Sequence, residues 1–526
     1  MRRRHAARGV RIRGRGRPKM MHRILDTAAM CEADRRTIAA GRPGIALMEA
    51  AGAAVADAAA GLVPHGARVL VACGPGNNGG DGFVAARLLA ARGFAPTVAL
   101  LGERARLAGD AATAASAWSG RVTAPGEADP RIIPLAQIDP AAFDLAIDAL
   151  FGAGLARDVD GTAAAFLEQL AGTGIPVVAV DVPSGVDGDT GRVRGTACPA
   201  TLTVTFARRK PGHLLMPGRS LCGRLVVADI GIPDAVIEGL APRTSANEQA
   251  LWRDAFPHPA LDAHKYARGH ALVLSGPADA TGAARLVARG ALRIGAGAVT
   301  VGSPRDALAV NAAHLTAIML RPCDDAADLA GLLEDARLNV VALGPGLGRG
   351  RARALVEAAA GATHAADRAL VLDADALTAF AGEHAALAAL CARMGAVVAT
   401  PHAGEFAKLF SQCAQAREAP SKLAAARAGA AALGIVLVDK GPDTVIAAPD
   451  GRAAINATGT PYLATAGSGD VLAGFVAGLL AQGMPAFEAA CAAVWLHGCA
   501  GARLGPGLIA EDLPEVLPGV LGEVLA

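Results

Sequence analysis

Residues 74–82, GPGNNGGDG, have the composition of a ligand-binding turn, with five glycines, two asparagines and one aspartate. They follow the strand-like run 67–73 and precede a helical pattern. Glycines let backbone N–H groups approach an anion, and the positive end of a following helix adds to the attraction. This pattern favours a phosphate or pyrophosphate ligand, although a tight turn without a ligand remains the alternative for this loop alone. No lysine of the chain follows a glycine, which excludes a Walker A loop.

Two further turns carry acids directly after apolar runs, at 148–154 and 181–187. Ligands of open parallel sheets bind beyond the carboxyl ends of the strands, so these turns and the glycine loop are expected to share one edge. The oxygen-bearing side chains of Asn78, Asp148 and Ser184 suit a hard cation beside an anionic ligand. Asp181 would remain free for proton transfer. For each acid taken alone, a turn or helix-cap role is the alternative.

A second set of candidate residues lies near the carboxyl end of the chain, where 458–470 leads into an apolar helical run. Gly467, Gly469 and the first N–H groups of that helix would form an anion hole beside Asp470. Such a site suits phosphoryl transfer, with Asp470 as the base that takes a proton from the attacking hydroxyl. The alternative is that Asp470 only caps the helix. The neighbouring turns that follow predicted strands are 344–348, 373–377, 400–405 and 440–444.

Alternating strand-like and helical runs must position these turns, and they predict two α/β units. In the first unit, helical patterns are expected at 24–60 and 83–92. A Rossmann-like parallel sheet is expected from strands within residues 69–206. Its strands are expected at 69–72, 97–101, 145–148, 177–181 and 201–206. The strands of the second unit are expected at 271–275, 298–301, 340–343, 370–373, 397–400 and 435–439.

A chain of 526 residues exceeds what one hydrophobic core usually supports, which agrees with two domains. The alternating pattern weakens near residue 240, so we expect domains at 21–240 and 241–526. Residues 1–20 form a basic tail with nine Arg or Lys and no acid. The tail could be a disordered arm or a transit-like segment, but we favour translation starting at Met20 or Met21.

Charge and cysteine usage exclude several classes of function. The net charge of the whole chain is +2, so the chain beyond the tail carries −7, and nucleic acid is not an expected partner. The nine cysteines form no CxxC pair, which argues against a zinc site or a disulfide framework and favours the cytoplasm. No apolar run approaches the roughly 20 residues needed to cross a bilayer, so a membrane is not an expected partner either.

The first unit resembles the NAD(P)H-hydrate epimerase family over about residues 21–235. The resemblance rests on GPGNNGGDGFVAARLL, DALFGAGL, DVPSGVDGDTG and TFARRKPGHLLMPGR. It implies a potassium ion held by Asn78, Asp148 and Ser184, and proton transfer by Asp181. It also implies that the hydrated nucleotide contacts Asn77, Asn78, Gly79, Gly80, Asp81, Gly152, Ala153, Gly154, Leu155, Ala156, Arg157, Asp158 and Asp181.

The second unit resembles the ADP-dependent NAD(P)H-hydrate dehydratases of the ribokinase-like superfamily over about residues 255–520. HKYARGHALVLSG, GPGLG, DADAL, TPHAGE, KGPDT and the turn before Asp470 carry the resemblance. It implies a ribokinase-like α/β fold, ADP as co-substrate and Mg²⁺. The implied substrate contacts are Ala296, Gly348, His402 and Asp470, and the implied nucleotide contacts are Lys440, Gly441, Pro442, Asp443, Thr444 and Gly469.

Together the two resemblances imply a bifunctional repair enzyme, expected to be a homo-oligomer. The first domain would interconvert the R and S hydrates of NADH or NADPH, and the second would phosphorylate the S hydrate from ADP so that loss of phosphate restores NAD(P)H. Two alternatives stay open. The second domain could be a kinase that releases a stable phosphoester, and the first could be a non-catalytic nucleotide-binding module.

Overall fold

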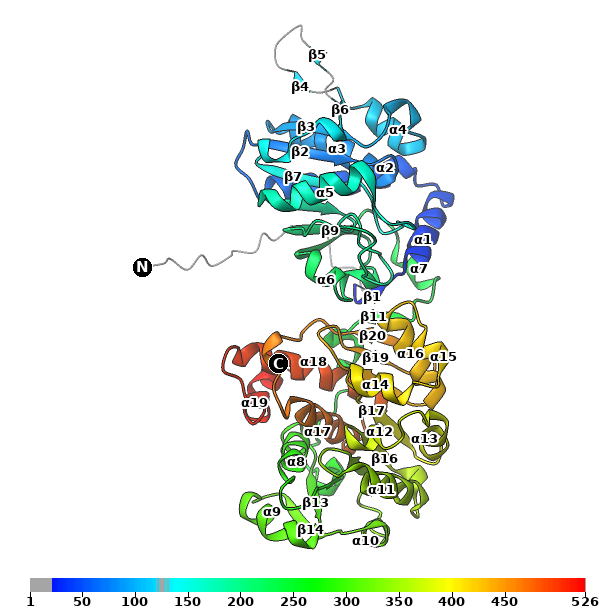
Figure 1. Ribbon diagram of the computed structural model, residues 1–526, viewed down its shortest axis with the longest axis vertical. Helices are drawn as coiled ribbons and strands as arrows, with labels where there is room; N and C mark the ends of the chain where they lie inside the picture. Colours follow the sequence, from blue (N-terminus) through cyan, green and yellow to red (C-terminus); the bar gives the residue numbers. More distant parts are fainter. Residues whose placement is uncertain (1–20, 120, 123–127, 130–131, 526) are drawn as a thin grey trace, which may run out of the picture.

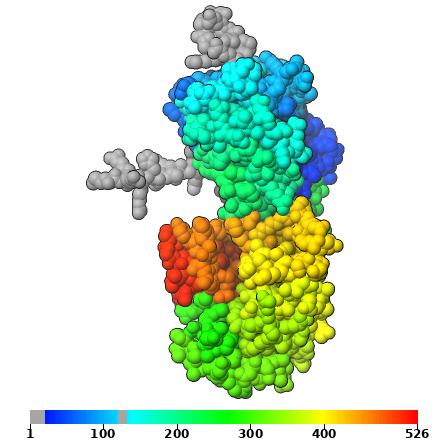
Figure 2. Space-filling view, in the orientation of Figure 1, coloured from blue at the N-terminus to red at the C-terminus, as the bar shows by residue number. Residues whose placement is uncertain are grey.

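The computed structural model describes residues 21–119, 121–122, 128–129 and 132–525, which form two lobes stacked along the long axis of the molecule (Figure 1). The first lobe contains the N-terminal half of the chain, and Figure 2 shows that the second lobe is built from the green to red part. The predicted basic tail lies outside the described residues. Among the residues described, none of the helices has both the length and the apolar character needed to cross a bilayer.

A seven-stranded sheet, parallel throughout, forms the centre of the first lobe. Its central strands are apolar runs buried on both faces, as expected for a parallel sheet. In spatial order the strands are β10 (Arg224–Ala228), β9 (Leu202–Phe206), β8 (Val177–Val180), β7 (Leu145–Ala149), β2 (Arg68–Cys73), β3 (Ala95–Leu100) and β6 (Ile132–Pro134). A separate antiparallel pair of strands consists of β4 (Arg121–Val122) and β5 (Ala128–Asp129).

Helices cover both faces of this sheet and complete three layers. One face packs in a single apolar cluster against α1 (Thr27–Ala39), α2 (Gly44–Ala60), α3 (Asn77–Ala91) and α4 (Gly109–Ser116). The other face packs against α5 (Gly161–Thr173). Two short helices, α6 (Gly218–Leu221) and α7 (Asp234–Glu238), lie near the end of this half. The Rossmann-like three-layer prediction is confirmed.

The second lobe contains an eleven-stranded sheet that is mostly parallel. The pairs of β19 with its two neighbours and the pair at the β1 edge are antiparallel. In spatial order the strands are β1 (Arg23–Ile24), β11 (Thr244–Ala246), β20 (Ala453–Ile455), β19 (Val445–Ala447), β18 (Val436–Asp439), β17 (Ala396–Ala399), β16 (Ala369–Leu372), β15 (Val340–Leu343), β12 (His270–Leu274), β13 (Ala298–Ser303) and β14 (Met319–Pro322).

Helices cover both faces of the second sheet as well, which gives the expected ribokinase-like α/β layers. One face packs on α8 (Gly282–Arg293), α17 (Ser468–Ala481), α18 (Ala486–Leu504) and α19 (Asp512–Leu525). The other packs on α11 (Arg349–Gly361), α13 (His384–Cys391), α14 (Ala403–Leu409) and α16 (Lys422–Leu433). Shorter helices are α9 (Leu308–His314), α10 (Ala326–Leu332), α12 (Asp375–Thr378) and α15 (Ala414–Arg417).

The strands predicted in both units are confirmed, but two helical predictions need correction. The helical pattern expected at 24–60 is confirmed in α1 and α2, but it is not one continuous helix, because β1 overlaps its start and the chain is interrupted between α1 and α2. Gly41 there has a φ of 100°, a conformation that helices do not tolerate, and Pro43 cannot donate a helical N–H. In addition, α3 begins at Asn77, so the second half of the glycine-rich stretch is the first turn of a helix.

The two lobes share structure at their junction. Strand β1 comes from the start of the chain but pairs antiparallel with β11 at the edge of the second sheet. The guanidinium of Arg219 donates to the carbonyl oxygens of Pro442 and Ala457, each at 2.7 Å, and the Met216 N–H donates to Asp443 Oδ2 at 2.8 Å. A division of the chain near residue 240 stays a prediction. Strand β1 lies before this boundary in the sequence but belongs to the sheet of the second lobe.

Candidate active sites

The glycine-rich stretch is packed tightly against its own lobe. A Cβ on Gly79 would lie 2.0 Å from the Gly74 carbonyl oxygen, and a Cβ on Gly74 would lie 1.8 Å from that of Leu150. Real Cβ atoms do not come this close, so glycine is required where the start of α3 crosses the turn after β7. Gly82 meets the Ala149 side chain in the same way, at 2.8 Å. These glycines therefore make room for protein packing and bring Asn77 and Asn78 beside the turn at Phe151.

Asp148 lies at the carboxyl end of β7 and is fully buried. Its two carboxylate oxygens accept hydrogen bonds from the Ser184 hydroxyl and N–H, at 2.6 and 2.8 Å. Burial raises the pKa of Asp148 above its ordinary value, although these hydrogen bonds oppose the rise. Asn78 lies nearby, because a Cβ on Gly152 would be 3.1 Å from its Oδ1, and its Nδ2 is buried without a hydrogen-bond partner among the described residues.

Asp181 follows β8 in the left-handed region, with a φ of 67°, which is strained for an aspartate. The Lys210 ammonium lies 2.6 Å from its Oδ1, and the Thr205 hydroxyl donates to the same oxygen at 2.9 Å. The Ala153 N–H donates to Oδ2 at 3.1 Å. Burial acts to raise the pKa of Asp181, but the adjacent Lys210 charge and these hydrogen bonds lower it to about 2. The carboxylate is thus held ionised.

His213 fixes the backbone of the same residue. Its Nδ1 accepts the Lys210 N–H at 2.8 Å, so Nε2 carries the proton and donates to the Asp181 carbonyl oxygen at 2.7 Å. The ring is buried, and burial lowers the pKa of His213 to about 4, so it stays neutral. The segment 210–213 therefore holds both the carboxylate and the backbone of Asp181.

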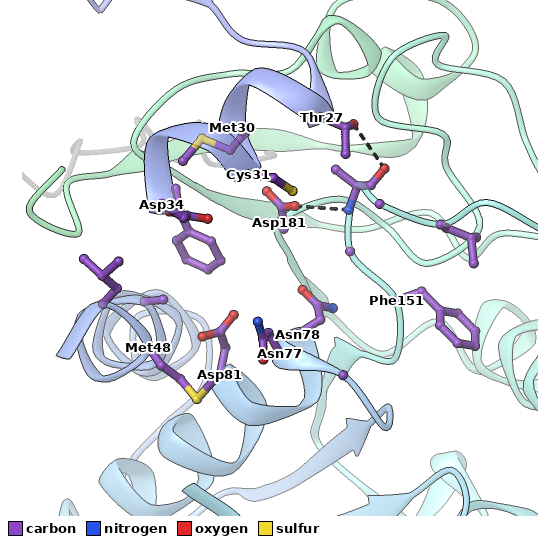
Figure 3. A pocket seen from close by; sticks show the side chains of 18 of the residues that line it. Thr27, Met30, Cys31, Asp34, Met48, Asn77, Asn78, Asp81, Phe151 and Asp181 are labelled. Carbon is purple, nitrogen blue, oxygen red and sulfur yellow. Dashed lines mark hydrogen bonds between the residues drawn. The ribbon is translucent and has the colours of Figure 1, made fainter. Parts of the chain in front are cut away.

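These groups open into a cavity of about 690 Å³, within the range of small-molecule and cofactor sites. Figure 3 shows Asp181 and the two asparagines between α1, α3 and the turn at Phe151. Asp34 of α1 and Asp81 of α3 also face the cavity. Burial raises the pKa of Asp34 to about 6, and burial with the nearby Asp181 raises the pKa of Asp81 well above its ordinary range. The cavity therefore combines one carboxylate that is held ionised with two carboxyl groups whose pKa values are raised.

In the second lobe, Lys440 lies among three carboxyl groups at the carboxyl edge of the sheet. Its ammonium is 2.8 Å from Asp373 Oδ1 and 4.0 Å from Glu405 Oε2. Asp470, the third carboxyl group, stands in the first turn of α17, and its pKa responds to Asp373, Lys440 and Glu405. Burial and the nearby Asp373 raise the pKa of Asp470 to about 6 while Lys440 opposes the rise. A base that is ready to accept a proton near neutral pH fits these surroundings.

The start of α17 has the expected form of an anion site. Gly467 is the N-cap with a φ of 85°, and a Cβ on Gly469 would lie 3.4 Å from Lys440 Nζ. Behind this turn, the buried His497 Nε2 lies 3.0 Å from the Ser468 carbonyl oxygen and 3.1 Å from its hydroxyl. The Lys440 ammonium therefore lies beside the first turn of the helix, whose N–H groups donate no hydrogen bond to a capping side chain among the described residues.

Two comparisons with known families cover both lobes. Residues 271–514 match the family described as NAD(P)H-hydrate dehydratase, and residues 44–212 match the family described as YjeF-related protein N-terminus. The bifunctional NAD(P)H-hydrate repair enzyme Nnr of Moorella thermoacetica is 39% identical over 500 residues, which is 91% of this chain and 92% of the relative. The enzyme of the same name from Thermofilum pendens is 37% identical, over 90% of this chain and 91% of that one.

The chain belongs to the bifunctional NAD(P)H-hydrate repair enzymes. Among solved structures, the ADP/ATP-dependent NAD(P)H-hydrate dehydratase of Bacillus subtilis, co-crystallised with ATP and Mg²⁺, is 31% identical. It covers 53% of this chain and 98% of its own, with a TM-score of 0.44.

The structure brings most of the predicted residues of this repair enzyme to two places. Asn77, Asn78, Asp81, the turn 152–157 and Asp181 line the first cavity. Gly79, Gly80 and Asp158 are not among its lining residues; the two glycines are buried in α3. In the second lobe, Gly348, His402 and Lys440 follow the carboxyl ends of strands, and Gly469 lies with Asp470 in the first turn of α17.

Three predictions for the second site of the repair enzyme need revision. Ala296 is 3% exposed in the core and precedes β13, so it lies at the opposite edge of a parallel sheet from Asp470. Asp443 and Thr444 are buried, and Asp443 is held by the Lys422 ammonium at 2.9 Å and by the Met216 N–H. Their position favours shaping of the loop over direct contact, which leaves Gly441 and Pro442 exposed for a nucleotide.

Several lining residues of the first cavity were missed by sequence reasoning. Four of them are Met30, Cys31, Asp34 and Lys210. A signal existed for α1, because its cavity residues recur at helical spacing. Lys210 lies inside the quoted TFARRKPGH motif, but a lysine is normally a surface residue, so nothing local indicated that it would be buried against Asp181.

The implied cations can be tested against the donor atoms of this repair enzyme. Among the described residues, no three His, Cys, Asp or Glu side chains are grouped to hold a metal ion. The buried Asp148 carboxylate, the Ser184 hydroxyl and the unpartnered Asn78 amide nevertheless fit a monovalent cation, since an amide turned about its axis presents oxygen. For Mg²⁺, Asp373 and Glu405 are already engaged with Lys440, which suits an ion brought by nucleotide phosphates.

Proposed function

We propose that the first lobe interconverts the R and S hydrates of NADH and NADPH, and that the second dehydrates the S hydrate at the expense of ADP, releasing AMP and phosphate. The similarity to a bifunctional repair enzyme over 91% of the chain carries this proposal, because it spans both sites. The ionised Asp181 in a cavity of about 690 Å³ and the base-like Asp470 beside an anion site support it independently.

In the first site, Asp181 acts as the base. The hydrate carries a hydroxyl on C6 next to N1, so removal of the hydroxyl proton lets C6=O form as the C6–N1 bond breaks. Rotation and reclosure then give the other epimer. The ion pair with Lys210 and the hydrogen bond from Ala153 keep the carboxylate ionised and oriented for this proton transfer.

In the second site, Asp470 takes the proton from the C6 hydroxyl as that oxygen attacks the terminal phosphorus of ADP. Phosphate is a far better leaving group than hydroxide, so the N1 lone pair can expel it from C6, and loss of a proton from C5 then restores the ring double bond. The first N–H groups of α17 and Lys440 stabilise charge on the transferred group. Mg²⁺, when bound with the nucleotide, supplies charge neutralisation on the phosphates.

A mixture of both hydrates tests the two activities together. With the protein and ADP, NADH absorbance is expected to recover for the whole mixture, because the R form is converted to the S form. Recovery of only the S fraction would contradict the epimerase, and no recovery with ADP or ATP would contradict the dehydratase. A phosphorylated product that persists after nucleotide use would favour the alternative of a small-molecule kinase.

We further propose that Asn78, Asp148 and Ser184 hold a potassium ion that orders the turn at Phe151. Added K⁺ is expected to raise the Tm of the ligand-free protein in a saturable way, while N-methylglucamine at equal ionic strength does not. Asp148→Asn is expected to abolish the K⁺-dependent part of the shift, because a neutral amide loses the charge attraction to the cation. Equal shifts with both cations would contradict the site.

A cytoplasmic location belongs to the same proposal. All nine cysteines lie in the described residues and none forms a disulfide, which agrees with a reducing compartment. The homo-oligomer expected from the sequence stays a prediction.

A further inference from the structure

Helix α1 supplies one wall of the first cavity. Its lining residues Thr27, Met30, Cys31, Asp34 and Ile38 recur every three or four positions, which places them on one face of the helix. Figure 3 shows Met30, Cys31 and Asp34 on this helix above the cavity that also receives Asp181. Asp34 therefore faces the site from a helix and not from the end of a strand.

One oxygen of the Asp34 carboxyl lacks a protein partner among the described residues. This oxygen, Oδ1, is buried and has no hydrogen-bond partner in the part of the chain that the structure describes. A buried oxygen without a partner costs free energy, and native proteins usually retain one only where a ligand, an ion or chemistry requires it. The described residues thus leave one oxygen of a cavity-lining carboxyl unpaired.

The charged and titratable groups that face Asp34 define its protonation. They are Lys210 and Asp181, which act on it across the cavity, Asp81 from α3, and Cys31 from its own helix. The Lys210 ammonium is paired with Asp181 at 2.6 Å, and it lowers the pKa of Asp34 by less than burial raises it. Burial raises the pKa of Asp34 to about 6, against about 2 for Asp181. Two carboxyl groups of one site whose environments separate them in this way suit an acid and a base.

We propose that Asp34 is the proton donor that works with Asp181 in the first site, facing the substrate from α1. This inference rests on the proposed epimerase activity. Opening of the ring needs a donor as well as a base, because N1 receives the electron pair of the broken C6–N1 bond and must gain a proton.

The proton balance closes over one cycle. Asp181 gains the proton of the C6 hydroxyl while Asp34 loses its proton to N1, so the open aldehyde form is bound by a protonated Asp181 and an ionised Asp34. After rotation, N1 attacks C6, Asp34 recovers the N1 proton and Asp181 returns its proton to the new hydroxyl. No other reactant is consumed.

Asp81 is the rival donor, and its position argues for a different role. It is 8% exposed, and burial together with the nearby Asp181 raises its pKa well above the ordinary value of an aspartate. A donor must release its proton in every cycle, which favours a group that titrates near the working pH. Asp81 is more deeply buried than Asp34, which suits a fixed hydrogen-bond donor to the ligand better than a group that exchanges its proton in every cycle.

The experiment measures epimerisation by NMR exchange between R and S hydrates as a function of pH, with wild type, Asp34→Asn and Asp34→Glu. For wild type, the rate is expected to fall as pH rises through about 6, because Asp34 loses its proton. D34N is expected to lower kcat by about 10²–10⁴-fold and to lose this pH limb, with KM little changed. D34E keeps a carboxylic acid and is expected to recover part of the rate, with the limb at a shifted pH.

Glu32→Gln is the matched control, since Glu32 lies on the same helix in solvent-exposed ion pairs with Arg35 and Arg36. It is expected to behave as wild type. A D34N protein with the wild-type rate and pH limb would overturn the role of Asp34 while leaving the epimerase intact. A wild-type protein without epimerisation would instead refute the proposed function. Dehydratase activity reports whether each variant is folded. If D34N fails to fold, D34E is the deciding variant. A D34E protein whose rate falls at the same pH as wild type would overturn the role of Asp34 as proton donor.

Discussion

Replacing Asp181 by Asn is expected to slow interconversion of the two hydrates by about 10²–10⁴-fold, the contribution typical of a positioned general base. The amide cannot accept the hydroxyl proton, although it can still receive the Ala153 N–H. The loss is expected in kcat measured by NMR exchange. Dehydration of purified S hydrate by the same protein should be unchanged, because Asp470 lies in the other lobe.

The substitution also leaves the buried Lys210 ammonium without its counter-ion, and breaking such a pair costs about 3–5 kcal/mol. A double variant, Asp181→Asn with Lys210→Met, separates the two effects. It removes both charges, so most of the Tm is expected to return without any return of epimerisation. Asp144→Asn is a suitable control, because Asp144 forms an exposed ion pair with Arg68 at the other end of β7. Epimerisation by D181N at the wild-type rate would contradict the assignment of the base.

The second large effect is expected from Asp470→Asn, which should lower the ADP-dependent recovery of NADH by about 10²–10⁴-fold. The wild-type rate of this step should fall as pH drops below about 6, because the raised pKa of Asp470 leaves the carboxyl protonated there and a base must be ionised. The measurement is the pH profile of NADH recovery from S hydrate.

Glu511→Gln provides the matched control for Asp470, since it makes the same carboxylate-to-amide change at an exposed position just before α19. Epimerisation by the Asp470→Asn protein should be unaffected. Retained dehydration with a normal pH profile would show that Asp470 only caps α17.

Both sheets were predictable because their central strands are short apolar runs buried on two faces, as in β15 and β16. The three-residue strands β19 and β20 carry too little pattern to be separated from loops. Strand β1 pairs with residues about 220 positions away, so no local signal marks it. The start of α3 was missed because glycines and asparagines are poor helix formers, and only the packing of the lobe makes a helix of them.

The site residues divide in the same way. Asp148 and Asp181 end predicted strands and Lys440 follows one, so topology alone places them at the right edge. Asp34 and Lys210 act through tertiary neighbours: one has an unpartnered buried oxygen, and the other is buried against Asp181. Such features depend on distances between distant segments, which spacing along the chain does not encode.

Because β1 comes from the start of the chain and pairs in the second lobe, the two halves cannot simply be separated near residue 240. An expression product that starts after residue 240 would lack the outermost strand of its own sheet, and the backbone of β11 would be open to pairing with another chain. The same cut would remove Ile24, Leu214 and Leu215, which are buried in the apolar cluster of the second lobe. The second lobe therefore needs residues from before its own catalytic domain in order to fold. Exchanging one half for that of a relative requires that β1 be transferred together with the second half.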